Sequence, residues 1–92
     1  MSAAASSVED RMRARLAVLE PESLDIADDS AKHAGHEGAK SGGGHYQLVI
    51  VSSLFTGTRP QARHRMVYDA LGPMMQREIH ALSIKAFAPH EL

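Results

Sequence analysis

The fold of this chain is decided by Phe55-Thr-Gly-Thr-Arg-Pro-Gln-Ala-Arg-His-Arg-Met-Val-Tyr-Asp-Ala-Leu71, followed after a short gap by Ile79-His80-Ala81-Leu82. Phe55-Thr-Gly57 predicts a turn. Pro60 suits the first turn of a helix, where its missing N–H would have gone unpaired anyway. The residues expected to form the buried stripe of this helix are Met66, Val67, Ala70 and Leu71.

The segment after this helix predicts a second helix and a last strand. Gly72-Pro73 stops the first helix, and Pro73 can open a shorter one through Met74, Met75 and Arg77. Leu82 to Ala86 alternates between apolar and polar residues, which is typical of a strand. Because two helices separate this strand from the preceding one, the chain must return by a crossover.

Two further strands are expected upstream, separated by a long loop. His45 to Val51 is rich in β-branched residues and apolar on both sides from Leu48 onward, so it should be the central strand. Leu24-Asp-Ile26 alternates and predicts a short strand. Residues 28–44 offer almost nothing to bury and predict a long flexible loop, whose length is equally compatible with function and with disorder.

The first helix is marked by Ser6-Ser-Val-Glu9, which predicts a capping box and a helix start near Ser7. Pro21 cannot continue the helix, which should end by Leu19 or Glu20. Residues 1–6 are expected to be disordered. The predicted order is therefore helix, strand, strand, helix, helix, strand within a single domain spanning 1–92. The apolar face of this first helix is predicted to contain Val8, Met12, Leu16 and Leu19.

Composition narrows the possible chemistry. The 92 residues include no cysteine, so this chain cannot form disulfides or hold an iron–sulfur cluster with its own thiolates. A net charge of −1 gives no global attraction to nucleic acid, and any DNA binding must come from a local patch. No apolar run is long enough to span a membrane, so a soluble, cytoplasmic protein is expected. No catalytic motif is evident, and we expect no enzymatic activity.

The joint occurrence of Phe55-Thr-Gly57, Arg63-His64-Arg65-x-Val67-Tyr68 and His80-Ala81-Leu82 resembles the BolA family, and the resemblance runs from about Ser23 to Leu92. It implies an α+β fold of order αββααβ, in which helices cover one face of a three-stranded mixed sheet, similar to a type II KH domain. Leu71 to Met75 contains no second glycine and cannot form the Gly-x-x-Gly loop of a KH domain, which disfavours KH-style RNA binding.

Histidines are the candidate metal ligands. His80 is expected between the short helix and the last strand, where the simplest interpretation is a boundary histidine with one backbone hydrogen bond; the resemblance instead implies a cluster ligand. His33 and His36 lie in the long loop with His-x-x-His spacing. Even with His45 they provide no thiolate, so a zinc site is weakly supported and a solvated loop with incidental histidines fits as well. The resemblance implies a second cluster ligand in this loop and leaves His33 and His36 open.

The helix between Pro60 and Leu71 supplies candidate contact residues. Arg65 can pair with Asp69 at four-residue spacing, which needs no function. His64 is implied by the resemblance to be structural rather than a ligand. The predicted contacts with a partner or with nucleic acid are Arg59, Arg63, His64, Arg65, Tyr68 and Arg77, of which Arg59, Arg63 and Tyr68 are expected to share one flank.

The preferred hypothesis is an adaptor in iron–sulfur metabolism. Two histidines can replace two thiolates on one iron of a [2Fe–2S] cluster, and this chain could supply only the histidines. The resemblance implies that a monothiol glutaredoxin with bound glutathione supplies the rest. Metal binding requires neutral imidazole, so acidification should loosen the complex.

The alternative hypothesis is a DNA-binding regulator of stress or morphology, in which the two helices joined at Gly72-Pro73 act like a helix-turn-helix. The segment from Phe55 to Leu82 contains four arginines and two acidic residues. This excess of two positive charges is small for a DNA-binding surface. Arg77 is the only strong base-contacting candidate on the shorter helix. We therefore expect at most weak, salt-sensitive binding, and a monomer or weak homodimer when the chain is alone.

Overall fold

The computed structural model describes residues 7–29 and 44–92. Their helices and strands follow the predicted order, with one difference in helix type described below. The elements are α1 (Val8–Leu16), β1 (Ser23–Asp28), β2 (Gly44–Val51), α2 (Pro60–Leu71) and β3 (Ile79–Phe87), with short 3-10 helices η2 (Ala17–Leu19), η5 (Ser53–Phe55), η6 (Gly72–Gln76) and η7 (Pro89–Glu91).

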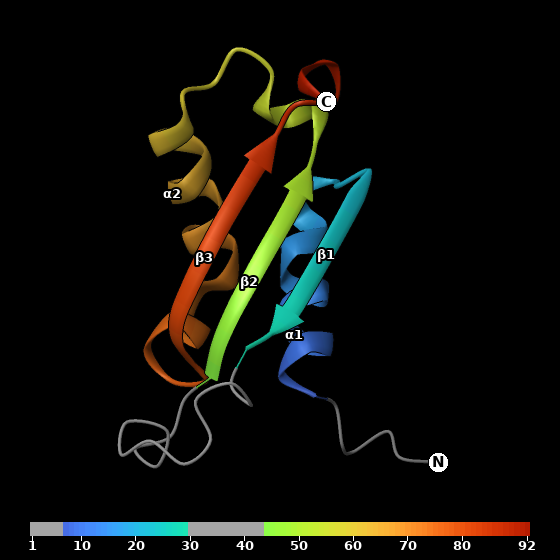
Figure 1. Ribbon diagram of the computed structural model, residues 1–92. Coiled ribbons are helices and arrows are strands. Elements are labelled where there is room, and N and C mark those ends of the chain that lie inside the picture. Colours follow the sequence, from blue (N-terminus) through green and yellow to red (C-terminus); the bar gives the residue numbers. More distant parts are fainter. Residues whose placement is uncertain (1–6, 30–43) are drawn as a thin grey trace.

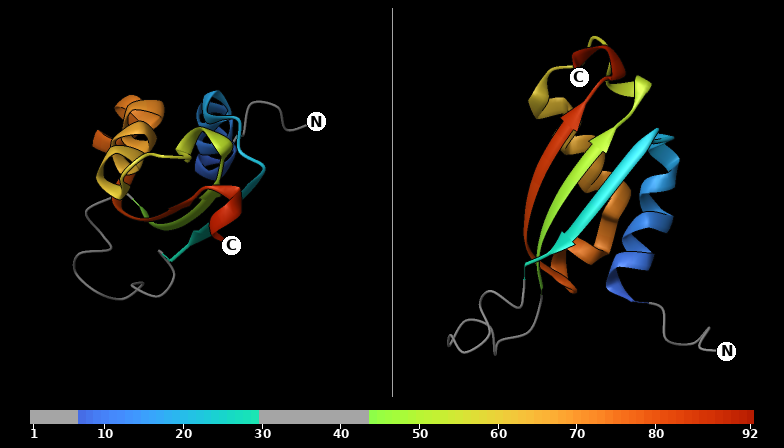
Figure 2. Two further views of the ribbon diagram at one scale, coloured as in Figure 1. Left: turned by 90° about the horizontal axis from the view of Figure 1, so that it is seen from above. Right: turned by 45° about the vertical axis from the view of Figure 1, so that its right-hand side comes forward.

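The three strands form one mixed sheet in the order β1-β2-β3. β1 is antiparallel to β2, and β2 is parallel to β3, as the crossover through α2 requires. Both α-helices lie on the same face of the sheet and leave the other face open (Figures 1 and 2). The predicted α+β class, the mixed sheet and the central place of β2 are confirmed.

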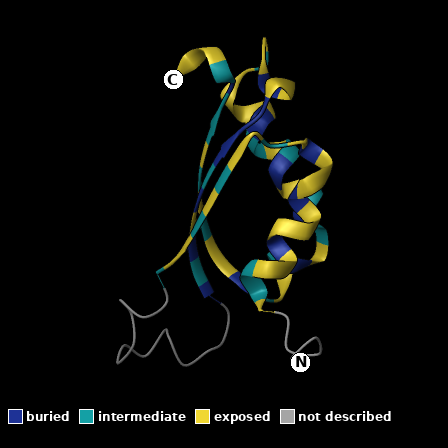
Figure 3. Cartoon of the chain, turned by 90° about the vertical axis from the view of Figure 1, so that its right-hand side faces the viewer, coloured by how far each residue is buried: buried dark blue, intermediate teal, exposed yellow. Residues whose placement is uncertain are grey.

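The core lies between the helices and the covered face of the sheet (Figure 3). Leu48 and Ile50 of β2 point inward at two-residue spacing, and Met12 and Leu16 of α1 at four-residue spacing, so each element presents one apolar side. Phe55, which follows β2, is also completely buried. Burial of such side chains stabilises the fold by about 1.5–3 kcal/mol each.

The start of α1 differs slightly from the prediction. Ser7 is the N-cap, and its hydroxyl accepts a 3.0 Å hydrogen bond from the backbone N–H of Asp10. The predicted capping box centred on Ser6, which lies outside the described residues, as do the rest of 1–6 and residues 30–43 of the predicted loop. The helix continues through η2 and stops at Glu20, whose φ of 52° is left-handed, and this end agrees with the prediction.

The buried stripe of α2 also differs. Val67 and Leu71 are fully buried as predicted, whereas Met66 and Ala70 are only half-buried. The third buried position is Arg63, which lies four residues before Val67 on the same side of the helix. The sequence pattern placed this arginine on the surface, because such a pattern takes account of a residue's polarity but not of the hydrogen bonds that it can make in the fold.

The predicted second helix after Gly72-Pro73 is the 3-10 helix η6 and not an α-helix. Gly72 ends α2 with φ of 57°, and η6 closes at Gln76, which leaves Arg77 beyond it. A helix after the Gly72 break was predicted and is present, but its five residues of 3-10 helix differ from the longer recognition helix of a typical helix-turn-helix. Among the described residues, no helix combines the length and apolarity needed to cross a bilayer.

Candidate functional site

His80 lies within β3 and not before it, because the strand begins at Ile79, three residues before the predicted start at Leu82. The register of the parallel pair shifts here: Gly44 is opposite Ile79, but His45 is opposite Ala81. His80 is therefore an extra residue, a β-bulge, and its side chain is exposed. Bulges re-aim side chains at the ends of sheets and next to functional sites.

The bulge brings His80 against His45. Their ring centroids are 5.2 Å apart and the rings are tilted by 30°. Two imidazoles that bind one metal at about 2.0–2.1 Å with a tetrahedral angle have ring centres roughly 5 Å apart, so the pair is spaced as two ligands of one ion would be. Within 7–29 and 44–92, no group of three or more possible ligands gathers, so these residues alone do not complete a metal site.

His45 as a partner of His80 is the residue that sequence reasoning missed, since it was considered only as a third histidine for the loop. A signal was available. Parallel strands joined by a crossover start at the same edge of a sheet, and His45 and His80 are each the second residue of their strand.

The surroundings of the pair hold the strand ends together. The N–H of Asp29 donates to the carbonyl oxygen of His45 at 2.7 Å, and the N–H of Gly44 donates to that of Glu78 at 2.8 Å. Gln47 donates to the Asp29 carboxylate. A Cβ at Gly44 would overlap the Tyr46 ring, so a larger residue at this position would require that ring to move.

The open face of the sheet is hollowed beside His45. A cavity of about 270 Å³ reaches from Asp29 and His45 across to Ser83 of β3. Burial, together with the nearby charge of Asp28, raises the pKa of Tyr46 at this edge. The chain leaves the described residues at Asp29 and returns at Gly44, next to the histidine pair, whereas the predicted ligands His33 and His36 lie outside the described residues.

Arg63 is placed very differently from the prediction. Its side chain is 8% exposed and its guanidinium makes a two-pronged ion pair with Glu91, with both N–O distances 2.7 Å. It also donates to the carbonyl oxygens of Thr58 at 2.7 Å and Ala86 at 3.0 Å, and lies 5.9 Å from the centre of the Phe55 ring. Arg63 is therefore a fold-holding residue and not a surface contact, and it shares no exposed flank with Arg59.

We call the Arg63–Glu91 ion pair, with the bonds from Arg63 to Thr58 and Ala86, the clamp. Each charge of the pair shifts the pKa of the other. Hydrogen bonding from Arg63 and from the Ala88 N–H lowers the pKa of Glu91 to about 2, and the Glu91 carboxylate raises the pKa of Arg63. The clamp ties α2 to the end of β3 and to η7. Arg63 therefore joins the part of the chain before α2 to its last residues.

The other predicted contact residues stay near the surface but do not converge. Arg59 is the exposed N-cap of α2, Arg65 is exposed and His64 is half-buried. Tyr68 is 41% exposed. Arg77 follows η6 and lines a separate pocket with two arginines of α1, considered below.

Comparison with known proteins identifies relatives that cover most of this chain. The family model described as "BolA-like protein" matches residues 16–91. BolA-like protein 1 of Mus musculus is 40% identical over 89 residues, which are 96% of this chain and 63% of that protein, so the chain spans less than two thirds of this relative. The DNA-binding transcriptional regulator BolA of Escherichia coli is 33% identical over 84 residues, covering 91% of this chain and 74% of that protein.

The fold is also similar to solved structures. The structure titled "BolA domain of SufE1 from Arabidopsis thaliana" superposes with a TM-score of 0.74 at 40% identity, covering 89% of this chain and 92% of that one. Sequence and structure therefore point to the same set of relatives.

Proposed function

This chain belongs to the BolA-like protein family, and we propose that it is a non-catalytic adaptor that binds a monothiol glutaredoxin and co-ligates a bridging [2Fe–2S] cluster through histidine. The observation that carries the proposal is the exposed His80, displaced by a β-bulge and spaced 5.2 Å from His45, ring centre to ring centre. An exposed imidazole beside a half-buried one, at the end of the sheet where β2 and β3 begin, is suited to a ligand that a second protein also binds.

The donor set fits one half of such a cluster. A [2Fe–2S] cluster accepts two histidines in place of two thiolates on one iron, which raises its reduction potential. Because the sequence has no cysteine, thiolates must come from outside this chain. A glutaredoxin cysteine and its bound glutathione would provide them.

His80 is the first ligand in this proposal, and three histidines compete to be the second. His33 and His36 are the candidates that the family resemblance implies, and His45 is the candidate that the structure adds. His33 is four residues beyond Asp29 in the sequence, and Asp29 is bonded to the backbone of His45. All three candidates are therefore connected by a short length of chain to the same end of the sheet.

The contact surface for the partner changes once Arg63 is removed from it. Arg65 and Tyr68 remain exposed on α2, and a guanidinium can pair with the carboxylates of glutathione. We therefore assign partner contact to Arg65 and Tyr68.

The test is anaerobic reconstitution of iron and sulfide with this protein, a monothiol glutaredoxin and glutathione, followed by visible absorption and circular dichroism. Wild type should give a spectrum unlike that of glutaredoxin alone, and His80→Ala should remove the difference. His90→Ala is the matched control, because His90 is exposed beyond the opposite end of β3 and its loss should leave the spectrum unchanged. An identical spectrum with and without this chain would rule out cluster binding.

The same assay identifies the second ligand. His33→Ala, His36→Ala and His45→Ala are compared one at a time, and the true ligand should reproduce the loss seen with His80→Ala. If only His45→Ala does so, the ligand pair is the one seen in the structure. If all three retain the wild-type spectrum, none of the three is required as the second ligand.

DNA binding is a second candidate, favoured by the name of the Escherichia coli relative and by the exposed arginines Arg59, Arg65 and Arg77. Because α2 is followed by a 3-10 helix and not by an α-helix, we expect contact mainly through phosphates, and affinity should fall steeply with salt. Fluorescence anisotropy with unrelated duplexes tests this. Equal affinities for all sequences would reduce DNA binding to an incidental property, whereas a salt-resistant preference for one sequence would establish a regulator.

Location and assembly remain predictions. A cytoplasmic location is tested by imaging the tagged full-length protein. A weak homodimer would form through the open edge of β1 or β3, and sedimentation at increasing concentration would detect it.

A further inference from the structure

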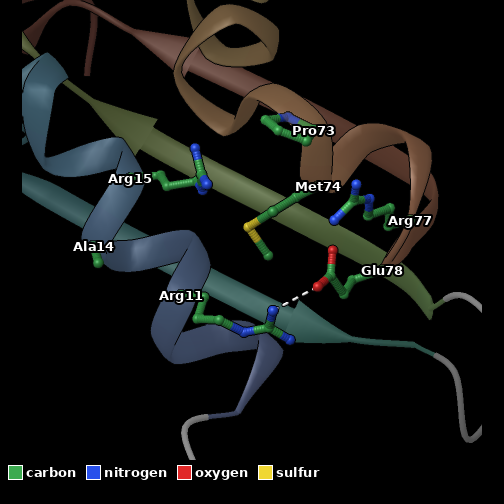
Figure 4. A pocket seen from close by; sticks show the side chains of 7 residues that line it. All are labelled: Arg11, Ala14, Arg15, Pro73, Met74, Arg77 and Glu78. Atoms are coloured by element: carbon green, nitrogen blue, oxygen red, sulfur yellow. Dashed lines mark hydrogen bonds and ion pairs between the residues drawn. The ribbon is translucent and has the colours of Figure 1, made fainter.

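Three arginines line one pocket on the helix side of the molecule, away from the open face of the sheet. Arg11 and Arg15 come from α1, and Arg77 comes from the segment after η6 (Figure 4). The pocket encloses about 400 Å³, a size typical of small-molecule sites. No local sequence pattern links these residues, since α1 and η6 are more than 50 residues apart.

The charges in the pocket are only partly balanced. Glu78 binds Arg11 at 2.5 Å, and the hydrogen bond from Arg11 lowers the pKa of Glu78. Within the described ranges, no hydrogen bond or ion pair involves the side chain of Arg15 or Arg77. Three guanidiniums against one carboxylate leave two positive charges in excess, although the whole chain carries −1.

The position of Arg15 is constrained by the backbone opposite it. Its guanidinium lies 3.3 Å from the place where a Cβ of residue 72 would be, and Gly72 has none. Arg15 therefore lies over the end of α2, while Figure 4 shows Arg77 extending toward Met74 from the opposite side. The guanidiniums of Arg15 and Arg77 lie on opposite sides of the pocket.

The base of the pocket is apolar. Met74 is 3% exposed and lies between the arginines, and Ala14 and Pro73 complete the apolar lining. Guanidinium groups pair with phosphate oxygens through two parallel hydrogen bonds, and the apolar base gives an organic group something to pack against. Two excess charges match the two charges of a phosphate monoester.

We propose that this pocket binds a small organic phosphate monoester, with the phosphate between Arg15 and Arg77 and the organic group against Met74. The site is separate from the histidine pair and does not depend on cluster binding. Arg11 is held by Glu78 and shapes the rim of the pocket.

The test uses adenosine 5′-monophosphate as the probe, with calorimetry and amide chemical shifts as readouts. Binding should saturate and shift amides in α1 and η6. Arg15→Gln and Arg77→Gln should each weaken it about tenfold, since a charged hydrogen bond contributes that much. Lys85→Gln removes one positive charge from the open face and should change affinity less than twofold. Equal losses in all three variants would overturn the proposal in favour of general charge attraction.

Three further probes separate the two parts of the ligand. Inorganic phosphate should bind more weakly than the monophosphate, because it has no organic group. Adenosine should not bind, and cyclic 3′,5′-adenosine monophosphate, with a single charge, should bind about tenfold more weakly. Equal affinity for inorganic phosphate, or for adenosine, would overturn the assignment to a phosphate monoester. Thermal unfolding of each variant confirms that the fold is retained.

Discussion

The two ends of the β2–β3 strand pair differ in how they hold a residue of the sequence motifs: Arg63 at one end is buried, and His80 at the other is exposed. Where the strands finish, Arg63 is buried, and each of its three guanidinium nitrogens donates a hydrogen bond to Thr58, Ala86 or Glu91. Where the strands begin, His80 is exposed and its ring lies beside that of His45, with the ring centres 5.2 Å apart.

This difference separates two motifs that occur together in the sequence. A buried cation is costly unless it is paired and hydrogen-bonded, so Arg63 must be saturated by the fold. A ligand for a shared metal group must instead keep its ring nitrogen available. The motif that contains Arg63 therefore holds the sheet and the helix together. The motif that contains His80 leaves an imidazole available as a ligand at the opposite end.

The largest effect is expected from Phe55→Ala, which tests whether the Arg63 end is the structural one. Phe55 is completely buried under Arg63, so truncation should lower the free energy of unfolding by about 3–5 kcal/mol. The adjacent Leu54 is 43% exposed, and Leu54→Ala should cost much less. Urea denaturation measures both, and similar losses would contradict the assigned packing.

A smaller loss is expected from Arg63→Lys. An ammonium group cannot hold Glu91 with two prongs and also reach Thr58 and Ala86, so thermal stability should fall although the charge is kept. Arg59→Lys is the matched control on the exposed start of the same helix. Equal melting temperatures for the two variants would mean that the clamp does not stabilise the fold.

The contribution of Glu91 should depend on pH. Hydrogen bonds from Arg63 and from the Ala88 N–H lower the pKa of Glu91 from an ordinary 4.5 to about 2, so the folded state favours the carboxylate. The stabilisation is fully present above pH 4.5 and is lost as the pH falls toward 2. Wild type should therefore be more stable than Glu91→Gln at pH 7, and their denaturation midpoints should converge near pH 2. A constant gap would show that the ion pair is not the cause.

The smallest effect on stability is expected at the other end. His80 is exposed and outside the core, so His80→Ala should change the free energy of unfolding by no more than about 0.5 kcal/mol. The same variant should remove the cluster spectrum of the complex. A large loss of stability would make His80 a second structural residue and remove the contrast between the two ends.

Much of the fold was predictable from local patterns. The run of β-branched residues predicted β2, Pro60 marked the first residue of α2, and Pro21 limited the first helix. The second helix after Gly72 was not predictable in type, because five residues are too few for periodicity to distinguish a 3-10 helix from an α-helix.

The candidate site was predictable only in part. His80 was selected from its motif, but its place in a bulge depends on the register between two strands that are joined through α2. Arg63 was wrongly predicted to lie on the surface. A charged residue is tolerated at a buried position only when acceptors reach it, and its main acceptor, Glu91, is 28 residues away and is not evident from local sequence.

The sequence by itself determined the order of elements, the absence of thiolates and the presence of histidine as the available ligand type. These follow from periodicity and composition, which are local or additive. Only the tertiary structure decided that His45 meets His80, that Arg63 is buried against Glu91, and that Arg11, Arg15 and Arg77 share a pocket. Each of these depends on packing between segments distant in the chain, where side-chain geometry and hydrogen-bond satisfaction outweigh the preferences of any one segment.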